Sequence, residues 1–305
     1  MRVLVTGGAG FIGSHVAEAC VAAGHEVAVL DDLSSGKREQ VPAGATFFEA
    51  DIRAPEGAAA MREFGCEVLV HHAAQMDVRR SVADPRFDAD VNLLGLLNLL
   101  EAGRVSGLRR VLFASSGGAG YGEQVEFPAP ETHPLAPMSP YGVAKIASEL
   151  YLGSFQAIYG IEWVAMRYAN VYGPRQDPHG EAGVVAIFAQ RLLRGETPTI
   201  NGDGGQTRDY VFVGDLVRAN VALLESPYCG ALNFGTGIET DVNTLYGHLA
   251  TACGRQDAAP EHGPAKPGEQ RRSVISPLRA REVLGWEPEV SLADGIARTV
   301  EFFRG

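Results

Sequence analysis

Two side chains four residues apart carry the clearest chemistry in this sequence. Tyr141 and Lys145 lie in the segment SPYGVAKIASELYL, which has a helical pattern. Residues i and i+4 share one face of a helix, so both side chains can point into the same cleft. A free tyrosine has a pKa of about 10, and acting as a base near neutral pH requires about 4 kcal/mol of extra phenolate stabilisation. A neighbouring ammonium in a partly desolvated site can contribute to this, so the pair predicts a general base; a chance Y-x-x-x-K on a surface helix is the alternative.

A glycine-rich turn near the start of the chain predicts the partner for this base. The segment TGGAGFIG fits G-x-G-x-x-G when counted from Gly8 and G-x-x-G-x-x-G when counted from Gly7. It lies between a predicted strand (residues 2–6) and a predicted helix (residues 11–23). Glycines there let the backbone turn tightly and approach a pyrophosphate at the helix N-terminus. The pattern therefore predicts a dinucleotide site, whose oxidised nicotinamide would add positive charge near the phenol.

Acidic and small residues after the next strands refine this site. Asp31 ends the second predicted strand, eighteen positions after Gly13. A carboxylate there accepts hydrogen bonds from ribose hydroxyls and repels a 2′-phosphate, so NAD is favoured over NADP. The pair Asp51-Ile52 follows the third strand and can contact the adenine. The small pair Ala73-Ala74 follows the fourth strand and leaves room for the cofactor.

A third catalytic group should hydrogen-bond the substrate hydroxyl and the tyrosine. The stretch FASS places Ser115 and Ser116 at the carboxyl end of the fifth predicted strand, where ligands of parallel sheets bind. Capping or turn formation is the alternative role of these serines.

The elements that position these residues read as an α/β fold. Short apolar runs alternate with helical patterns through the first half of the chain, which predicts right-handed crossovers and a Rossmann-like, doubly wound parallel sheet covered on both faces. The predicted strands are residues 2–6, 26–30, 45–49, 67–71, 110–114 and 163–167, and the later predicted helices are residues 85–104 and 141–158.

After about residue 168 the regularity ends. Loops rich in Gly, Pro and Asp follow, such as NVYGPRQDPHGEAG and NGDGGQTRD. Loops on a rigid scaffold commonly carry binding groups. We therefore expect an NAD-binding domain over residues 1–168, joined by about 211–235, and a smaller substrate-binding region over residues 169–210 and 236–305.

Composition narrows the class of protein. A formal charge of −11 argues against nucleic-acid binding, because phosphate neutralisation needs a basic face. The four cysteines are scattered without C-x-x-C spacing, which argues against a disulfide framework or a zinc site and fits a reducing cytoplasm. No signal peptide and no apolar run long enough to span a bilayer is visible. We expect a cytoplasmic protein without a bound metal, membrane or nucleic acid.

Together these features resemble the extended short-chain dehydrogenase/reductase family, and within it the UDP-glucose 4-epimerase branch. The resemblance covers almost the whole chain, through VTGGAGFIGSH, LDDLSSGKR, DIR, HHAAQ, NLLGLLNLLEA, FASSGGAGYGE, PYGVAK, RYANVYGPRQ, NGDGGQTRDYVFVGDLVRA, KPGEQRRS and LGWEP. It implies an isomerase that inverts C4 of a UDP-hexose with bound NAD. It also implies a homodimer formed through the helices around residues 93–100 and 141–159.

The resemblance also implies site residues. The family's cofactor-binding positions map onto Gly7, Gly10, Phe11, Ile12, Gly13, Asp31, Asp51, Ile52, Ala73, Ala74, Asn92, Tyr141, Lys145 and Tyr168. Its nucleotide-sugar positions map onto Asn170, Val184, Thr199, Asn201, Arg208, Lys266 and Glu269. Arg208 and Lys266 would neutralise the pyrophosphate, with Arg208 the stronger candidate because its planar fork can bind in a bidentate manner.

This sequence departs from the family pattern at three positions. Gly117 stands where the family places a catalytic serine or threonine, so Ser116, one residue earlier, is our candidate, and a backbone shift or a water can substitute. Lys266 stands where many relatives have Arg. Ser273 stands where some epimerases carry a bulky Tyr, which leaves room for an N-acetyl group at C2 of the sugar, so we expect the N-acetylated pair to be substrates too.

The expected mechanism is an oxidation followed by a reduction. Tyr141 as phenolate removes the proton of the 4-hydroxyl while a hydride passes from C4 to NAD, and both return after the 4-keto sugar has turned its other face. A 4,6-dehydratase needs an acidic pair where this sequence has Gly118 and Ala119, which cannot transfer protons. The sequence therefore argues against a dehydratase. A UDP-glucuronate epimerase or decarboxylase stays open, because it turns on a few pocket residues. A non-catalytic NAD sensor on this scaffold is expected to lose Tyr141 and Lys145, and both are present.

Overall fold

The structure is a computed structural model that describes residues 1–178, 183–265 and 270–305 of the 305-residue chain. The chain divides into two compact units. The first unit comprises residues 1–120, 137–167 and 217–232, and the second comprises residues 121–136, 168–216 and 233–305. The segment 121–136, which the expected boundaries place in the cofactor domain, groups with the second unit.

A seven-stranded sheet forms the scaffold of the first unit, as the alternating pattern predicts. Its strand order is β11-β6-β5-β4-β1-β2-β3, and the pairings from β3 through β5 are parallel. Because the carboxyl ends of parallel strands meet at one edge, the segments after β1, β2, β4 and β5 are brought together there. The strands are β1 (Arg2–Thr6), β2 (Glu26–Asp31), β3 (Ala45–Glu49), β4 (Val68–His71), β5 (Arg110–Ser116), β6 (Glu162–Tyr168) and β11 (Gly230–Phe234).

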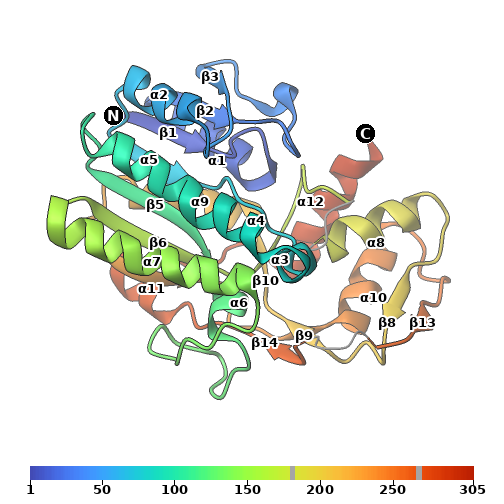
Figure 1. Cartoon of the computed structure of the whole chain (residues 1–305). Helices are drawn as coiled ribbons and strands as arrows, with labels where there is room; N and C mark the ends of the chain where they lie inside the picture. The colour runs from blue at the N-terminus through green and yellow to red at the C-terminus, as the bar shows by residue number, and fades with distance from the viewer. Residues whose placement is uncertain (179–182, 266–269) are drawn as a thin grey trace. The chain divides into compact units, whose positions relative to one another are not determined.

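Helices cover this sheet, and most of them lie on one face (Figure 1). The chain moves one way across the sheet from β1 to β3 and the other way from β4 to β6, so right-handed crossovers place α1 opposite α2, α5 and α7. The helical elements are α1 (Phe11–Ala22), η1 (Arg38–Gln40), α2 (Pro55–Phe64), α3 (Val78–Ala83), α4 (Pro85–Ala89), the π-helical turn η2 (Asp90–Leu94), α5 (Gly95–Gly103) and α7 (Pro140–Tyr159).

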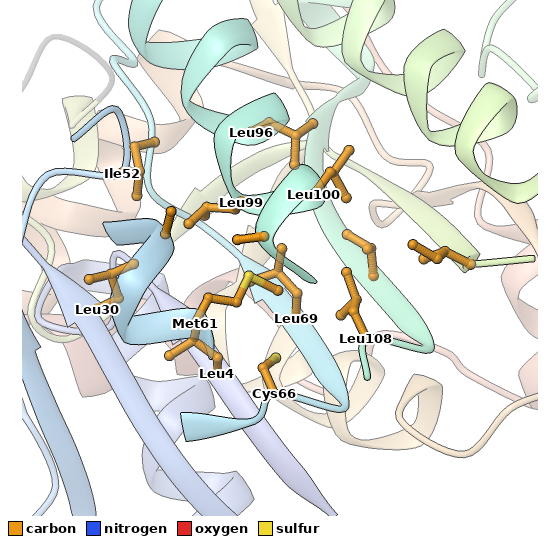
Figure 2. Close-up of a cluster of buried hydrophobic side chains, with 14 of the residues drawn as sticks. Leu4, Leu30, Ile52, Met61, Cys66, Leu69, Leu96, Leu99, Leu100 and Leu108 are labelled. Carbon is orange, nitrogen blue, oxygen red and sulfur yellow. The ribbon is translucent and has the colours of Figure 1, made fainter. Parts of the chain in front are cut away.

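The main apolar core lies between the sheet and this group of helices. Figure 2 shows Leu96, Leu99 and Leu100 of α5 pointing toward strand residues such as Leu69, with Met61 of α2 among them. All of these side chains are buried. Burying a leucine-sized side chain stabilises a fold by about 2 kcal/mol, so this cluster fixes the helices that carry the site.

The ends of α7 are encoded locally. Ser139 precedes the helix, and its Oγ accepts a hydrogen bond from the N–H of Gly142 at 3.2 Å. Pro140 occupies the first helical position, where a missing N–H costs nothing. Gly160 ends the helix in the left-handed conformation, with φ of 71°. The catalytic candidates Tyr141 and Lys145 therefore lie in the first two turns of a helix with a defined start.

The second unit is built from short strands and a helical group. β7 pairs with β10, β8 pairs with β13, and β9 lies between β12 and β14. Helices α8, α10 and α12 contact one another. The elements are β7 (Asn170–Tyr172), α8 (Val184–Leu193), β8 (Thr199–Asn201), β9 (Thr207–Arg208), β10 (Tyr210–Phe212), β12 (Thr240–Asp241), α10 (Val242–Ala252), β13 (Glu261–Gly263), β14 (Arg272–Ser273), α11 (Leu278–Leu284) and α12 (Leu292–Arg304). The chain passes between the units within α6 (Gly117–Tyr121), β6, α9 (Val213–Leu223) and β11, and between residues 136 and 137.

Candidate active site

The turn after β1 has the tight geometry that a pyrophosphate cradle needs. Gly7 has a φ of +65°, and a Cβ added there would lie 2.7 Å from the backbone nitrogen of Ala73. A Cβ on Gly13 would collide with the carbonyl oxygen of Gly7. Gly10 precedes α1, and neither a side-chain cap nor an acidic residue occupies the first turn of that helix. The N–H groups of this turn are therefore suited to an anion, and the residues fit the dinucleotide that the sequence predicts.

Asp31 ends β2 beside this turn. Its Oδ2 accepts a hydrogen bond from the N–H of Ala9, and its Oδ1 accepts one from the N–H of Leu33, both at 2.9 Å. Burial raises the pKa of the Asp31 carboxyl, and the two backbone hydrogen bonds oppose this. Each oxygen keeps a second lone pair, so the carboxylate can tie down the glycine turn and still accept from ribose hydroxyls.

The other predicted cofactor residues of the first unit are already engaged with their neighbours. The Asp51 carboxylate accepts four hydrogen bonds from the Arg53 guanidinium and backbone, while Ile52 is buried in the core. The N–H of Ala73, which precedes Ala74, donates to Thr6 Oγ1 at 3.2 Å. These contacts fix the loops, and direct contact with the adenine or the nicotinamide stays a prediction.

Asn92 lies at the centre of a buried polar cluster. Its Nδ2 donates to the backbone oxygen of Gln75 and to Asp88 Oδ1, both at 2.9 Å, and its Oδ1 accepts from the N–H of Gln75. The Nε2 of Gln75 donates to the same Asp88 oxygen at 2.9 Å. Sequence reasoning named Asn92 but missed Gln75 and Asp88. The only signal for them was a carboxylate and an amide in otherwise apolar helical and loop patterns.

Tyr141 and Lys145 lie on one face of α7, as their spacing predicts. Lys145 Nζ is 5.7 Å from the centroid of the Tyr141 ring and 4.8 Å from that of Phe113, and it donates to the Ala114 carbonyl at 2.8 Å. This last contact ties α7 to the end of β5. It places the ammonium at the same edge of the sheet as the glycine turn and Asp31.

Burial acts on both members of this pair. It lowers the pKa of Lys145 to about 8, against the opposing effect of the Asp88 and Glu149 charges. It raises the pKa of the Tyr141 phenol, and the Asp88 charge adds to that rise. In the chain alone the pKa of the phenol therefore lies above its usual value. The expected acidification needs the additional positive charge that an oxidised nicotinamide carries.

The two serines at the end of β5 have different partners. Ser115 donates to Glu149 Oε1 at 2.6 Å inside the core, while Ser116 Oγ accepts from the N–H of Ala119 at 3.3 Å at the start of α6. Ser116 thus makes the capping contact that we considered as its alternative role. Its hydroxyl proton is not used in that contact, so a role in catalysis stays a prediction.

The predicted sugar-nucleotide residues that the structure describes all lie in the second unit. Arg208 of β9 and Ser273 of β14 are register partners in adjacent parallel strands, which brings them together. The backbone N–H of Asn170 donates to the Asp209 carbonyl at 2.8 Å, next to Arg208. Thr199 and Asn201 lie on β8, and Val184 begins α8. The predicted residues Lys266 and Glu269 lie outside the described residues.

Two further residues of the second unit need separate mention. Tyr168, a predicted cofactor residue, ends β6 and packs edge-on against Phe234, with ring centroids 6.4 Å apart. Asp209, which sequence reasoning missed, is buried and accepts hydrogen bonds from Thr236 and Gly237. Burial raises the pKa of the Asp209 carboxyl, and these hydrogen bonds oppose the rise. Asp209 thus anchors the strand that carries Arg208.

Residues 1–178, 183–265 and 270–305 contain no group of three or more His, Cys, Asp or Glu side chains placed to hold a metal ion. None of their helices is long and apolar enough to cross a membrane. All four cysteines are free thiols.

Comparison with known proteins gives consistent matches. The model of the NAD dependent epimerase/dehydratase family matches residues 3–234. A UDP-glucose 4-epimerase of Mycolicibacterium smegmatis is 50% identical, over 100% of this chain and 99% of its own length. The structure of a Thermotoga maritima UDP-glucose 4-epimerase with UDP-glucose is 48% identical with a TM-score of 0.97, and that of a Thermus thermophilus UDP-glucose 4-epimerase with NAD is 51% identical with a TM-score of 0.94. Each covers 100% of this chain and 99% of the other.

Proposed function

This chain belongs to the NAD dependent epimerase/dehydratase family, and from that premise we propose that it is an isomerase that inverts C4 of a UDP-hexose, interconverting UDP-glucose and UDP-galactose. The observation that carries the proposal is the Tyr141–Lys145 pair at the edge of the sheet where the glycine turn and Asp31 also lie. A proton-transferring pair beside a dinucleotide cradle is what an oxidation at a carbinol carbon requires.

The first unit would hold NAD. The pyrophosphate would lie on the N–H groups at the start of α1, beside Gly7 and Gly13, and the ribose hydroxyls would donate to Asp31. Bound NAD would supply a hydride acceptor and donor for C4, so the reaction would have no net redox change. Because the cofactor would end each turnover in its starting oxidation state, it could stay bound between turnovers.

The proton steps fall to the chain's own residues. Tyr141 as phenolate takes the proton of the sugar 4-hydroxyl while the C4–H bond breaks, which leaves a 4-keto sugar. After the ketone presents its other face, Tyr141 returns the proton to the 4-oxygen as the C4–H bond re-forms with inverted configuration. Lys145, held by the Ala114 carbonyl, stabilises the phenolate through its charge. Ser116 would donate its free hydroxyl proton to the substrate oxygen.

The second unit would bind the UDP portion of the substrate. Arg208 is the candidate for the pyrophosphate, because a guanidinium binds two phosphate oxygens at once. Its strand is anchored by the buried Asp209 carboxylate. Ser273, beside Arg208 in the register of the two strands, would face C2 of the sugar and leave room for an N-acetyl group. Lys266 and Glu269 would complete the set.

We further propose a cytoplasmic homodimer. Four free thiols fit a reducing compartment. Apolar side chains exposed along η2 and α7, including Leu94, Val143, Leu150 and Ile158, would be covered by the same helices of a second copy. Sedimentation equilibrium tests this. A monomer at micromolar concentration would overturn the dimer without affecting the proposed activity.

A panel of nucleotide sugars tests the function. The protein is incubated with UDP-glucose, UDP-galactose, UDP-N-acetylglucosamine and UDP-glucuronate, and the products are resolved by chromatography. We expect UDP-galactose from UDP-glucose and the reverse. Conversion of UDP-glucuronate alone would instead identify the epimerase or decarboxylase of that acid sugar. No conversion of any member with NAD bound would overturn the proposal.

A further inference from the structure

Asp88 is a buried carboxylate that the mechanism so far does not use. It lies in α4, which contacts α7, and it lines the same cavity as Ala144, the neighbour of Lys145 in the chain. Two amide groups hold its Oδ1, from Gln75 and Asn92, each at 2.9 Å. Within the described residues, no atom hydrogen-bonds the other oxygen, Oδ2, although it is completely buried.

The amide clamp also connects Asp88 to α7. The backbone oxygen of Asn92 accepts a hydrogen bond from Ser148 Oγ at 3.3 Å, less than one helical turn beyond Lys145. A carboxylate held at one oxygen by two donors cannot rotate freely. Its position and its free oxygen are therefore fixed relative to the start of α7.

The charged, titratable and polar groups around Lys145 come from four elements. On α7 itself are Tyr141 and Glu149, and Glu149 is already paired with Arg167 at 2.6 Å in the core. His71 ends β4 and His72 follows it. Burial lowers the pKa of both histidines to about 3, so both are neutral. β5 contributes the ring of Phe113 and the Ala114 carbonyl. α4 contributes Asp88, which makes no ion pair within 4 Å among the described residues.

We propose that Asp88 is the counter-charge that keeps Lys145 protonated, and so acts as a positioning residue for the Tyr141–Lys145 pair. The inference rests on the proposed function, since it explains how the base of that reaction keeps its ammonium. A buried ammonium without an opposite charge loses its proton, because desolvation penalises the charged form. Burial lowers the pKa of Lys145 to about 8 even with Asp88 present, and the Asp88 charge acts in the opposite direction.

A purely structural role predicts something different. If Asp88 served only to clamp Gln75 and Asn92, any acceptor at Oδ1 would do the same. Asp88→Asn keeps that acceptor and removes only the charge, with its new NH2 group at the position of Oδ2. The variant therefore separates the electrostatic role from the clamp.

The chain allows a direct measurement because it has only three lysines, Lys37, Lys145 and Lys266. Full-length NAD-loaded protein with ¹³C-labelled lysine gives three Cε signals, and the Lys145→Arg variant identifies the one of Lys145. Its shift is followed from pH 6 to pH 11. We expect the midpoint in Asp88→Asn to fall by about one pH unit or more relative to the unsubstituted protein.

Two controls keep the result interpretable. Asp90→Asn removes a carboxylate two residues away, which pairs with Arg53 at 2.9 Å, and the Lys145 midpoint should not move. If Asp88→Asn does not fold, as judged by near-ultraviolet circular dichroism, Asp88→Ser repeats the charge removal with a smaller side chain. An unchanged Lys145 midpoint in a folded neutral variant would overturn the proposal.

Activity gives a second and separable readout. In Asp88→Asn the alkaline limb of the kcat–pH profile should move down with the Lys145 midpoint, while kcat at pH 6 changes less than kcat at pH 8. The lysine titration needs no turnover. It can therefore contradict the role of Asp88 while epimerisation is observed, and it can support that role when no epimerisation is found. A loss of kcat that is equal at every pH would contradict the electrostatic role.

Discussion

The two units hold their candidate site residues by different means. In the first unit these residues follow parallel strands and are braced by buried polar contacts, such as the Glu149–Arg167 pair, whose side chains are 6% and 5% exposed. In the second unit an ion pair such as Arg271–Asp203 is 61% and 66% exposed. Several of the candidate residues there lie on strands of two or three residues, and these are Asn170, Thr199, Asn201, Arg208 and Ser273. A chemical step needs fixed geometry, whereas a binding site can tolerate small adjustments. The comparison predicts that first-unit substitutions act on kcat and stability, and second-unit substitutions on KM.

The largest effect is expected from the phenol. Tyr141→Phe removes the proton acceptor but leaves the ring against Lys145, so kcat should fall by about three orders of magnitude while KM and bound NAD stay near their original values. Turnover of UDP-galactose and the NAD released on denaturation are measured together. Tyr228→Phe serves as the matched control, since it removes a first-unit hydroxyl that donates to the Ala231 carbonyl. Near-normal turnover in Tyr141→Phe would show that Tyr141 is not the base, and the chemical step could then not be assigned to the first unit.

Stability gives the next test of the contrast. Glu149→Gln removes the carboxylate charge that pairs with the buried Arg167, which should cost about 3 kcal/mol. Asp203→Asn breaks an ion pair that solvent already screens, and should give no resolvable change. Trp163 lies in the first unit and Trp286 in the second, so urea unfolding in single-tryptophan backgrounds reports each unit separately. Equal losses in the two variants would show that burial is not what distinguishes the units.

The fold was largely accessible from the sequence because its signals are local. The strands predicted at residues 2–6 and 45–49 have those bounds, and α7 exceeds its prediction by one residue at each end. The helix predicted over residues 85–104 is instead broken by the π-helical turn η2. No periodicity signals that turn, because it depends on Asn92 bonding to the loop around Gln75.

The site was accessible only in part. The glycine spacing, the acid at the end of β2 and the Tyr–Lys spacing are short-range patterns with a physical meaning, and each led to residues that the structure brings to one edge. Asp88 and Asp209 could not be found in this way, because Asp88 is held in part by Gln75, 13 positions away, and Asp209 accepts from Ile275, 66 positions away. A carboxylate in a helical or strand pattern gives no sign of whether it will be exposed or clamped.

Arg208 tests whether a residue of the second unit acts on substrate binding. Replacing it with Ala removes a charge-assisted contact to the pyrophosphate, worth about 2 kcal/mol, so KM for UDP-glucose should rise about 30-fold with kcat changed much less. Steady-state kinetics separate the two. Arg194→Ala, an exposed arginine that bonds Gln190 on the same turn of α8, is the control and should leave both constants unchanged. A loss confined to kcat would assign Arg208 to the chemical step instead.

The smallest and most selective effect is expected at Ser273. This side chain is small and buried beside Arg208, and a tyrosine there would fill the space that we assign to an N-acetyl group. Ser273→Tyr should lower kcat/KM for UDP-N-acetylglucosamine by about tenfold relative to UDP-glucose, a difference of about 1.4 kcal/mol. The ratio of the two substrates is measured in one preparation, so any loss of folded protein cancels. Ser273→Ala keeps the space and should keep the ratio, because the expected selectivity depends on volume and not on the serine hydroxyl. An equal loss on both substrates in the tyrosine variant would mean that residue 273 does not face C2 of the sugar, and the second unit would then select its ligand through the nucleotide alone.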